Sequence, residues 1–144
     1  RIELLTELNQ KVRVKVSAYK GKVLVTGESE VAEIRDKIIA NIRIIKNITI
    51  VYNELVIKRP ASEASINKDA SINKKVRAVL RGISGYTDFD ETRVKVVVSA
   101  TNVYLMGLLH KEEAKVVSIE VQKIENISSV VTLFEYIEQE TLKK

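Results

Sequence analysis

The sequence has no cysteine, so neither a disulfide nor a thiolate-bound metal can stabilise its 144 residues. No apolar run approaches the roughly 18 residues that a membrane-spanning helix needs. The one histidine, His110, has no nucleophile or metal-binding side chain near it in the sequence, and we expect it on the surface at a helix start. Carboxylates alternate with basic residues instead of gathering as a catalytic pair. We therefore predict a protein that has no catalytic residues, metal or cofactor and is stabilised by packed apolar side chains.

What the sequence does contain is an internal repeat. Residues 13–27 read RVKVSAYKGKVLVTG and residues 93–107 read RVKVVVSATNVYLMG, and the two align without a gap. Self-similarity of this kind predicts two copies of one supersecondary unit. The only proline, Pro60, lies between the copies in KRPASEASINKDAS, whose small and polar residues are typical of a linker. The predicted organisation is a first unit, a linker, a second unit and a tail, at residues 1–58, 59–69, 70–138 and 139–144.

Each copy is predicted to begin with a hairpin. In residues 12–16 (VRVKV) valines alternate with cations, as in a half-buried strand, and Gly21 supplies the turn to a second strand. In the second copy we expect the turn at Thr101 and Asn102, since asparagine also tolerates a positive φ.

A helix and a third strand are predicted to follow each hairpin. The helices run from Ser29 to about Lys46 and from about residue 111 to residue 124, and the third strands cover residues 48–57 and 127–137. The inward stripes of the two helices are Ile34, Ile38, Ile42 and Ile45 in the first copy and Ala114, Val117, Val121 and Ile124 in the second.

The second unit has an additional leading helix, predicted over SINKKVRAVLRG at residues 71–82. Asp69 or Ser71 is available as its N-terminal cap and Gly82 as its terminator. Its apolar stripe consists of Ile72, Val76, Val79, Leu80 and Ile83. In the first unit only RIELLTELNQ precedes Val12, so the equivalent helix is expected to be short or missing, as in a piece of a longer protein.

The predicted fold class is α+β or α/β, with tandem α-β-β-α-β units that each hold a small mixed three-stranded sheet. A helix that joins two parallel strands crosses over right-handedly, so the helices are expected together on one face of each sheet. The other face is expected to be open and basic. The cations predicted to lie on it are Lys11, Arg13, Lys15 and Lys95.

Positive charge is concentrated in two places. The net charge is +5, and up to Pro60 there are 12 lysines and arginines against 7 acids, whereas the rest of the chain has 12 of each. Five cations nevertheless crowd onto or just before the leading helix of the second unit: Lys68, Lys74, Lys75, Arg77 and Arg81. With Leu80, Ile83 and Tyr86 at the end of that helix, they predict weak, salt-sensitive adhesion to an anionic membrane. The alternative is an ordinary solvated helix face.

The segment GKVLVTG, followed by a helix and a β-branched run, resembles the BON (bacterial OsmY and nodulation) domain. VSAYKGKVLVTGES, VYNEL, INKKVRAVL, VYLMGLL, KEEAK and VVTLFEYI together resemble the dual-BON outer-membrane lipoproteins of Gram-negative bacteria, over residues 12–137. The resemblance implies a periplasmic protein that supports envelope integrity, is enriched at the site of cell division, and is held at the outer membrane by an acylated cysteine outside this sequence.

The resemblance also implies a site. In that family the first helix of the second BON domain contacts anionic phospholipid, while Ser71 stands where the family can carry a large aromatic residue. The lipid-binding residues predicted on this basis are Ile72, Lys74, Lys75, Val76, Arg77, Leu80, Arg81, Ile83 and Tyr86. Outer-membrane assembly proteins are further candidate partners, and nucleic acid is not expected.

The sequence offers three other interpretations. The basic sheet face with Lys11, Arg13 and Lys15 would dock an envelope protein, and lipid would play no part. The residues GISG at 82–85 resemble the backbone-clamping loop of KH modules, but carboxylates follow them, so they are interpreted as a helix end and turn. Those carboxylates, Asp88, Asp90 and Glu91, could hold a hard cation, but they lack an EF-hand pattern and are interpreted as an ordinary charged loop.

Overall fold

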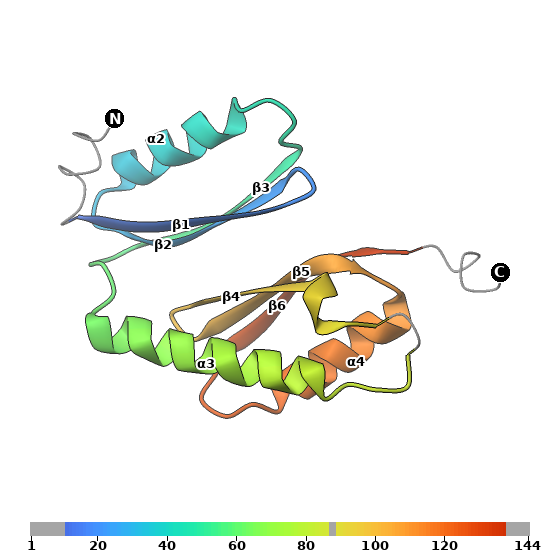
Figure 1. Cartoon of the computed structure of the whole chain (residues 1–144). Helices are drawn as coiled ribbons and strands as arrows, with labels where there is room; N and C mark the ends of the chain where they lie inside the picture. The colour runs from blue at the N-terminus through green and yellow to red at the C-terminus, as the bar shows by residue number, and fades with distance from the viewer. Residues whose placement is uncertain (1–10, 87–88, 138–144) are drawn as a thin grey trace. The chain divides into compact units, whose positions relative to one another are not determined.

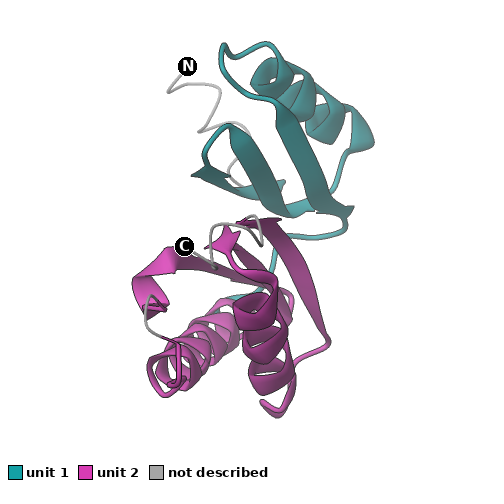
Figure 2. Ribbon diagram, turned by 90° about the vertical axis from the view of Figure 1, so that its right-hand side faces the viewer, with its two compact units in different colours: residues 1–63 teal, residues 64–144 magenta. Residues whose placement is uncertain are grey.

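The computed structural model describes residues 11–86 and 89–137 and divides the chain into two compact units, residues 1–63 and 64–144 (Figure 2). The leading helix of the first unit, expected to be short or missing, and the tail at 139–144 lie outside the described residues.

The first unit contains the predicted mixed sheet. Its elements are β1 (Val12–Tyr19), β2 (Lys22–Ser29), α2 (Ala32–Arg43) and β3 (Ile50–Ile57). The strand order is β1-β2-β3, in which β2 pairs antiparallel with β1 and parallel with β3. The helix α2 makes the crossover and covers one face of the sheet (Figure 1).

The second unit repeats this arrangement after a longer leading helix. Its elements are α3 (Glu63–Arg81), the 3-10 turn η1 (Glu91–Arg93), β4 (Val94–Ser99), β5 (Asn102–Leu109), α4 (Lys111–Gln122) and β6 (Ser129–Tyr136). The order β4-β5-β6 has the same antiparallel and parallel pairings. Helices α3 and α4 lie on one face of this sheet (Figure 1). The predicted fold class is thereby confirmed.

The linker predicted at residues 59–69 is wrong for most of its length, because α3 begins at Glu63. Only Pro60 breaks a helix in this segment, and the small and polar residues after it remain helical where one face of α3 packs against a core. Neither Asp69 nor Ser71 is therefore the cap. The predicted end is confirmed, since α3 stops at Arg81 ahead of Gly82.

The second hairpin turns one residue earlier than predicted. Its central residues are Ala100 and Thr101, with φ of 49° and 62°, where the first hairpin has Lys20 and Gly21. Asp69 of α3 explains how two non-glycine residues hold this conformation: its carboxylate accepts the backbone N–H groups of Ala100 at 3.0 Å and of Thr101 at 2.9 Å. The expected cap residue therefore holds the hairpin turn to α3.

Each unit has its own apolar core. The first core consists of Val23, Val25, Ile39, Ile42 and Leu55. The second is larger and includes Ile72, Val76, Leu80, Val96, Leu105, Val117 and Val121. The stripe predicted on α4 is confirmed by buried Ala114, Val117 and Val121 and by Ile124 packed against them.

The stripe predicted on α2 is only partly right. Ile42 is buried and Ile38 packs against the core, but the prediction missed buried Ile39 and wrongly placed Ile45 inside. Ile45 is 54% exposed because α2 ends at Arg43, two residues before it. Val16, predicted on the half-buried face, is 53% exposed at the edge strand β1.

The glycine that ends both copies of the repeat has a steric explanation. Gly27 and Gly107 have φ of 123° and 150°, which residues with a side chain rarely adopt. A Cβ atom at Gly27 would overlap the carbonyl oxygen of Arg13, and one at Gly107 would overlap that of Arg93. Both hairpins therefore require glycine where β2 or β5 passes the start of its neighbour.

Candidate functional site

The helix α3 separates the predicted lipid-binding residues between two faces. Ile72, Val76 and Leu80 are exposed by 2%, 0% and 1% and belong to the second core. Their prediction as lipid contacts is wrong for the folded unit, because their helical spacing directs them to the sheet. Only the polar part of the predicted set is left on the solvent side of α3.

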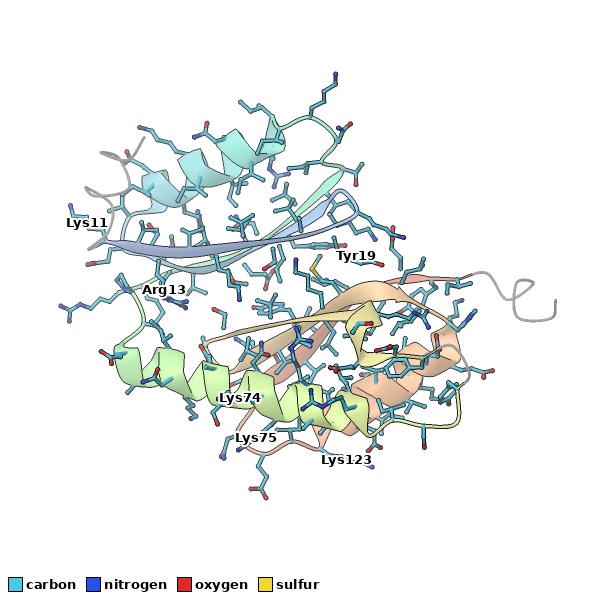
Figure 3. The ribbon with its side chains drawn as sticks, in the orientation of Figure 1. Lys11, Arg13, Tyr19, Lys74, Lys75 and Lys123 are labelled. Carbon is cyan, nitrogen blue, oxygen red and sulfur yellow. The ribbon has the colours of Figure 1, made fainter. Side chains whose placement is uncertain are left out.

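The solvent side of α3 is strongly cationic. Lys74, Lys75 and Arg81 are exposed and Arg77 is half-buried, and Figure 3 shows Lys74 and Lys75 projecting from this helix. At about 100° per residue, Lys74, Arg77 and Arg81 lie within about 60° of one another around the helix axis. Lys75 lies about 100° from Lys74, on the opposite flank of the solvent side from Arg77. We call the four residues Lys74, Lys75, Arg77 and Arg81 the α3 cationic face.

The acid nearest to these cations on α3, Asp69, faces the other way. Asp69 is 6% exposed, and both of its carboxylate oxygens accept backbone N–H groups of the β4–β5 turn. It is also the only acidic residue between Ala64 and Arg81. The exposed side of α3 beyond Glu63 therefore carries positive charge alone.

The end of α3 offers little apolar surface. Ile83 is half-buried against the second core and Tyr86 is half-buried as well. Arg81 lies 3.6 Å from the Glu91 carboxylate, but it is 57% exposed, and pairs in such positions are weak. A hollow of about 380 Å³ between this end of α3 and α4 is lined by apolar and polar residues: Ala78, Val79, Gly82, Ile83, Ser84, Val116 and Glu120.

The basic sheet face of the first unit carries an acid that was not expected there. In the antiparallel register of β1 and β2, Glu28 lies beside Arg13 and Thr26 beside Lys15. Arg13, labelled in Figure 3, donates to the Glu28 carboxylate from Nε at 2.9 Å and from Nη2 at 2.7 Å. Because Arg13 forms a bidentate ion pair with Glu28, the charge of Arg13 is not available to bind a partner protein.

Glu28 also fixes the segment that follows β3. Its Oε1 accepts the backbone N–H of Ala61 at 2.8 Å. Burial alone would raise the pKa of Glu28, but the hydrogen bonds from Arg13 and Ala61 and the charges of Arg13 and Lys58 lower it below its ordinary value of 4.5. The carboxylate is therefore a structural anion that ties β1, β2 and the chain after β3 together.

His110 is not the surface residue that was predicted. It is 8% exposed at the start of α4, where its backbone N–H donates to Glu113 Oε1 at 2.8 Å. The other oxygen of Glu113 accepts from Arg93 at 3.3 Å, and Arg93 also donates to the carbonyl of Leu108 at 2.8 Å. Burial follows from this capping arrangement, which the sequence alone does not reveal.

The remaining candidate motifs have structural roles. Gly82 follows the last residue of α3 and Gly85 has a φ of 95°, as expected for a helix end and turn. Asp90 caps η1 by accepting the Thr92 N–H at 2.9 Å, while Asp88 lies outside the described residues. Within residues 11–86 and 89–137, no three His, Asp or Glu side chains come together as metal ligands. None of the helices in those ranges is long and apolar enough to cross a membrane.

Comparison with known proteins shows which domain family and which protein the chain is similar to. Residues 3–59 match the model of the BON domain. Over 137 residues the chain is 26% identical to the outer membrane lipoprotein DolP of Haemophilus influenzae, an alignment that covers 95% of this chain and 69% of that protein.

Two solved structures of CdsD, a structural protein of the type III secretion system of Chlamydia trachomatis, were also found. Their sequence identities are 12% and 11% and their TM-scores 0.41 and 0.40, and the matches cover 98% and 94% of this chain and 92% and 94% of those chains. The family match reaches only the first unit. Residues 3–59 are thus similar to the BON domain, and the chain is similar along nearly its whole length to an outer membrane lipoprotein.

Proposed function

We propose that the protein is a non-enzymatic module of the bacterial envelope that rests on anionic phospholipid through the α3 cationic face. The observation that carries the proposal is the inward orientation of Asp69, which leaves Lys74, Lys75 and Arg77 without an acid of α3 on their side, while Arg81 has only its weak pair with Glu91. The similarity to an outer membrane lipoprotein supports the choice of a membrane as the partner. On the same basis we propose a periplasmic location, an N-terminal lipid anchor outside this sequence and a role in outer-membrane integrity.

The expected strength of this contact follows from the four cations. Each Lys or Arg near an anionic leaflet contributes about 1 kcal/mol, so the face supplies about 4 kcal/mol before losses. That free energy corresponds to a dissociation constant of about 1 mM. Such a contact is weak and salt-sensitive, which suits a protein that a lipid anchor already holds at the membrane.

Vesicle flotation tests the proposal. The full chain is mixed with phosphatidylcholine vesicles that contain or lack phosphatidylglycerol, and the parent is compared with Lys74→Glu/Lys75→Glu. Losing two attractive cations weakens binding by about thirtyfold or more, at about 1 kcal/mol for each cation. The matched control is Lys111→Glu/Lys115→Glu, which reverses two exposed cations on α4 of the same unit.

Both double variants lower the net charge by four, from +5 to +1, so bulk charge is the same. We expect the α3 variant to lose flotation on phosphatidylglycerol vesicles and the α4 variant to keep it. Equal losses would show that only net charge matters. Flotation of the α3 variant at the parent's level would refute the assignment to α3.

A further inference from the structure

The loop between α2 and β3 exposes isoleucine to an unusual degree. Ile44 is 82% exposed and Ile45 is 54% exposed directly after the end of α2 at Arg43, and Ile50 at the start of β3 is 40% exposed. Isoleucine is among the residues most often buried, and a contiguous exposed apolar group marks an interaction site more often than a single exposed residue does.

The same loop is surrounded by positive charge. Arg43 and Lys46 flank the two isoleucines, and no acidic residue occurs between Lys37 and Asn53. The turn of the first hairpin, with Lys20, lies at the same end of the unit (Figure 1), since Thr49 donates its backbone N–H to the carbonyl of Gly21 at 2.8 Å. Apolar side chains are thus bracketed by cations on a protruding loop, a combination that matches the anionic headgroup layer of a bilayer.

The second unit provides an internal comparison. Asn47 and its counterpart Asn126 have φ of 72° and 70°. The backbone bond from Thr49 to Gly21 recurs as a bond from Ser128 to Thr101, also of 2.8 Å. The two loops therefore share one backbone conformation, and their residues can be paired one by one.

That pairing shows that the fold does not require Arg43, Ile44 or Lys46. Reading back from the asparagines, RIIK at residues 43–46 stands opposite QKIE at 122–125. Lys123 replaces Ile44 and pairs with Glu120 at 2.8 Å, while Ile124 packs against the second core. The loop of the second unit thus folds with no net charge and with a lysine in place of Ile44. The two cations and the exposed Ile44 of the first loop therefore need a reason outside the unit's own stability.

We propose that Arg43, Ile44, Ile45 and Lys46, which we call the isoleucine tip, insert into the headgroup region of an anionic bilayer. In this arrangement Ile44 and Ile45 reach the boundary between headgroups and acyl chains, while Arg43 and Lys46 contact the phosphates. The inference goes beyond the α3 cationic face because it assigns a separate membrane contact to the other unit.

A fluorescence experiment tests insertion directly. The chain has no tryptophan, so Ile44→Trp introduces a single reporter at the tip, and Lys123→Trp places the same reporter on the paired position of the second unit. With phosphatidylglycerol-containing vesicles we expect the emission of the Ile44→Trp protein to move to shorter wavelength and to be quenched by brominated lipid. The Lys123→Trp protein is expected to show neither effect. Identical behaviour of the two reporters would overturn the proposal.

An exchange of the loops tests the energetics. Arg43→Gln/Ile44→Lys/Lys46→Glu gives the first loop the residues of the second loop, which has the same backbone conformation. We expect flotation on phosphatidylglycerol vesicles to weaken about thirtyfold or more, since the loop loses two cations, gains one lysine and one glutamate, and so changes by two charges at about 1 kcal/mol each. The reverse exchange, Gln122→Arg/Lys123→Ile/Glu125→Lys, is expected to strengthen flotation. Circular dichroism and a thermal melt confirm that both exchanged proteins fold, and unchanged flotation of both would refute the tip.

The proposals for the isoleucine tip and for the α3 cationic face can be refuted independently. If Lys74→Glu/Lys75→Glu binds as the parent does while the Ile44→Trp reporter inserts, the tip stands and the α3 assignment falls. If the α3 variant loses binding and the reporter on the parent background stays in water, the tip falls and the α3 assignment stands. Absence of any vesicle binding by the parent would overturn both.

Discussion

Replacement of Asp69 by alanine should destabilise the second unit by detaching the β4–β5 turn from α3. The carboxylate accepts the N–H groups of Ala100 and Thr101 at 3.0 and 2.9 Å and is itself 6% exposed. A hydrogen bond to a charged group contributes about 1.5 to 3 kcal/mol. Ala100 is exposed and Thr101 half-buried, so water replaces part of what is lost, and we expect a net loss of about 2 to 3 kcal/mol.

A thermal melt of the full chain measures this loss. For a chain of this size, each kcal/mol lowers the midpoint by about 2 to 4 °C, so Asp69→Ala is expected to melt about 4 to 12 °C below the parent. Asp69→Asn keeps one acceptor oxygen and is expected to lose about half as much. Residue-level hydrogen exchange should show faster exchange of the Ala100 and Thr101 amides in both variants.

Substitution of Thr101 by glycine separates the turn from other effects of Asp69. The first hairpin has Gly21 at this position, and glycine adopts a positive φ without the cost of about 1 to 2 kcal/mol that other residues incur. Asp69→Ala should therefore cost less in a Thr101→Gly background than in the parent. The reasoning would be refuted if Asp69→Ala melts with the parent, or if the Ala100 and Thr101 amides exchange at unchanged rates.

Two further predictions concern Glu28 and the glycines that end the two copies of the repeat. The pKa of Glu28 in the folded protein is lowered from 4.5, so the stability that the ionised carboxylate contributes is complete above pH 4.5 and is lost as the pH falls through the folded pKa. Urea denaturation between about pH 3 and pH 6 should therefore show a smaller loss of stability with acid in Glu28→Gln than in the parent. Parallel dependence of the two proteins on pH would contradict this. Gly27→Ala and Gly107→Ala should each lower the free energy of unfolding by about 2 kcal/mol or more, because the added Cβ atoms would overlap backbone carbonyls. The control is Gly82→Ala, whose Cβ would have its nearest neighbour 3.4 Å away, and it should change the free energy of unfolding by about 0.5 kcal/mol or less in the same assay.

The elements that sequence predicts well here are those fixed by local periodicity and by the repeat. Alternating valines gave the strands, the 3.6-residue period gave α4 and most of α3, and the glycine at the end of each hairpin was visible in both copies. These features depend on which face of an element is apolar, and a binary pattern carries that information directly. The mixed sheet then follows from the short hairpin and the longer crossover connection.

The errors arose where contacts between distant residues decide the outcome. Nothing local shows that Asp69 reaches the turn at Ala100, so the turn and the start of α3 were both misplaced. The alternation in β1 shows that Arg13 and Lys15 share a face, but not that Glu28 pairs with Arg13.

The same limitation applies to the candidate membrane surfaces. Cations at the spacing of α3 could be recognised in the sequence, but the apolar residues beside them were assigned to lipid although they fill the core. Ile45 was assigned to a core although it is exposed. Apolar character alone does not say whether a residue packs inward or faces a membrane, and only the position at which α2 ends separates Ile42 from Ile44.

Comparison of the two copies distinguishes what the fold demands from what it permits. Gly27 and Gly107, and the positive φ of Asn47 and Asn126, recur because one backbone geometry imposes them on both units. Arg43, Ile44 and Lys46 of the isoleucine tip have no such requirement, since Gln122, Lys123 and Glu125 stand opposite them in the second unit. Exposed apolar and basic residues that a duplicated fold does without in its other copy are not explained by stability, so selection for contact with another surface is the physical account that remains.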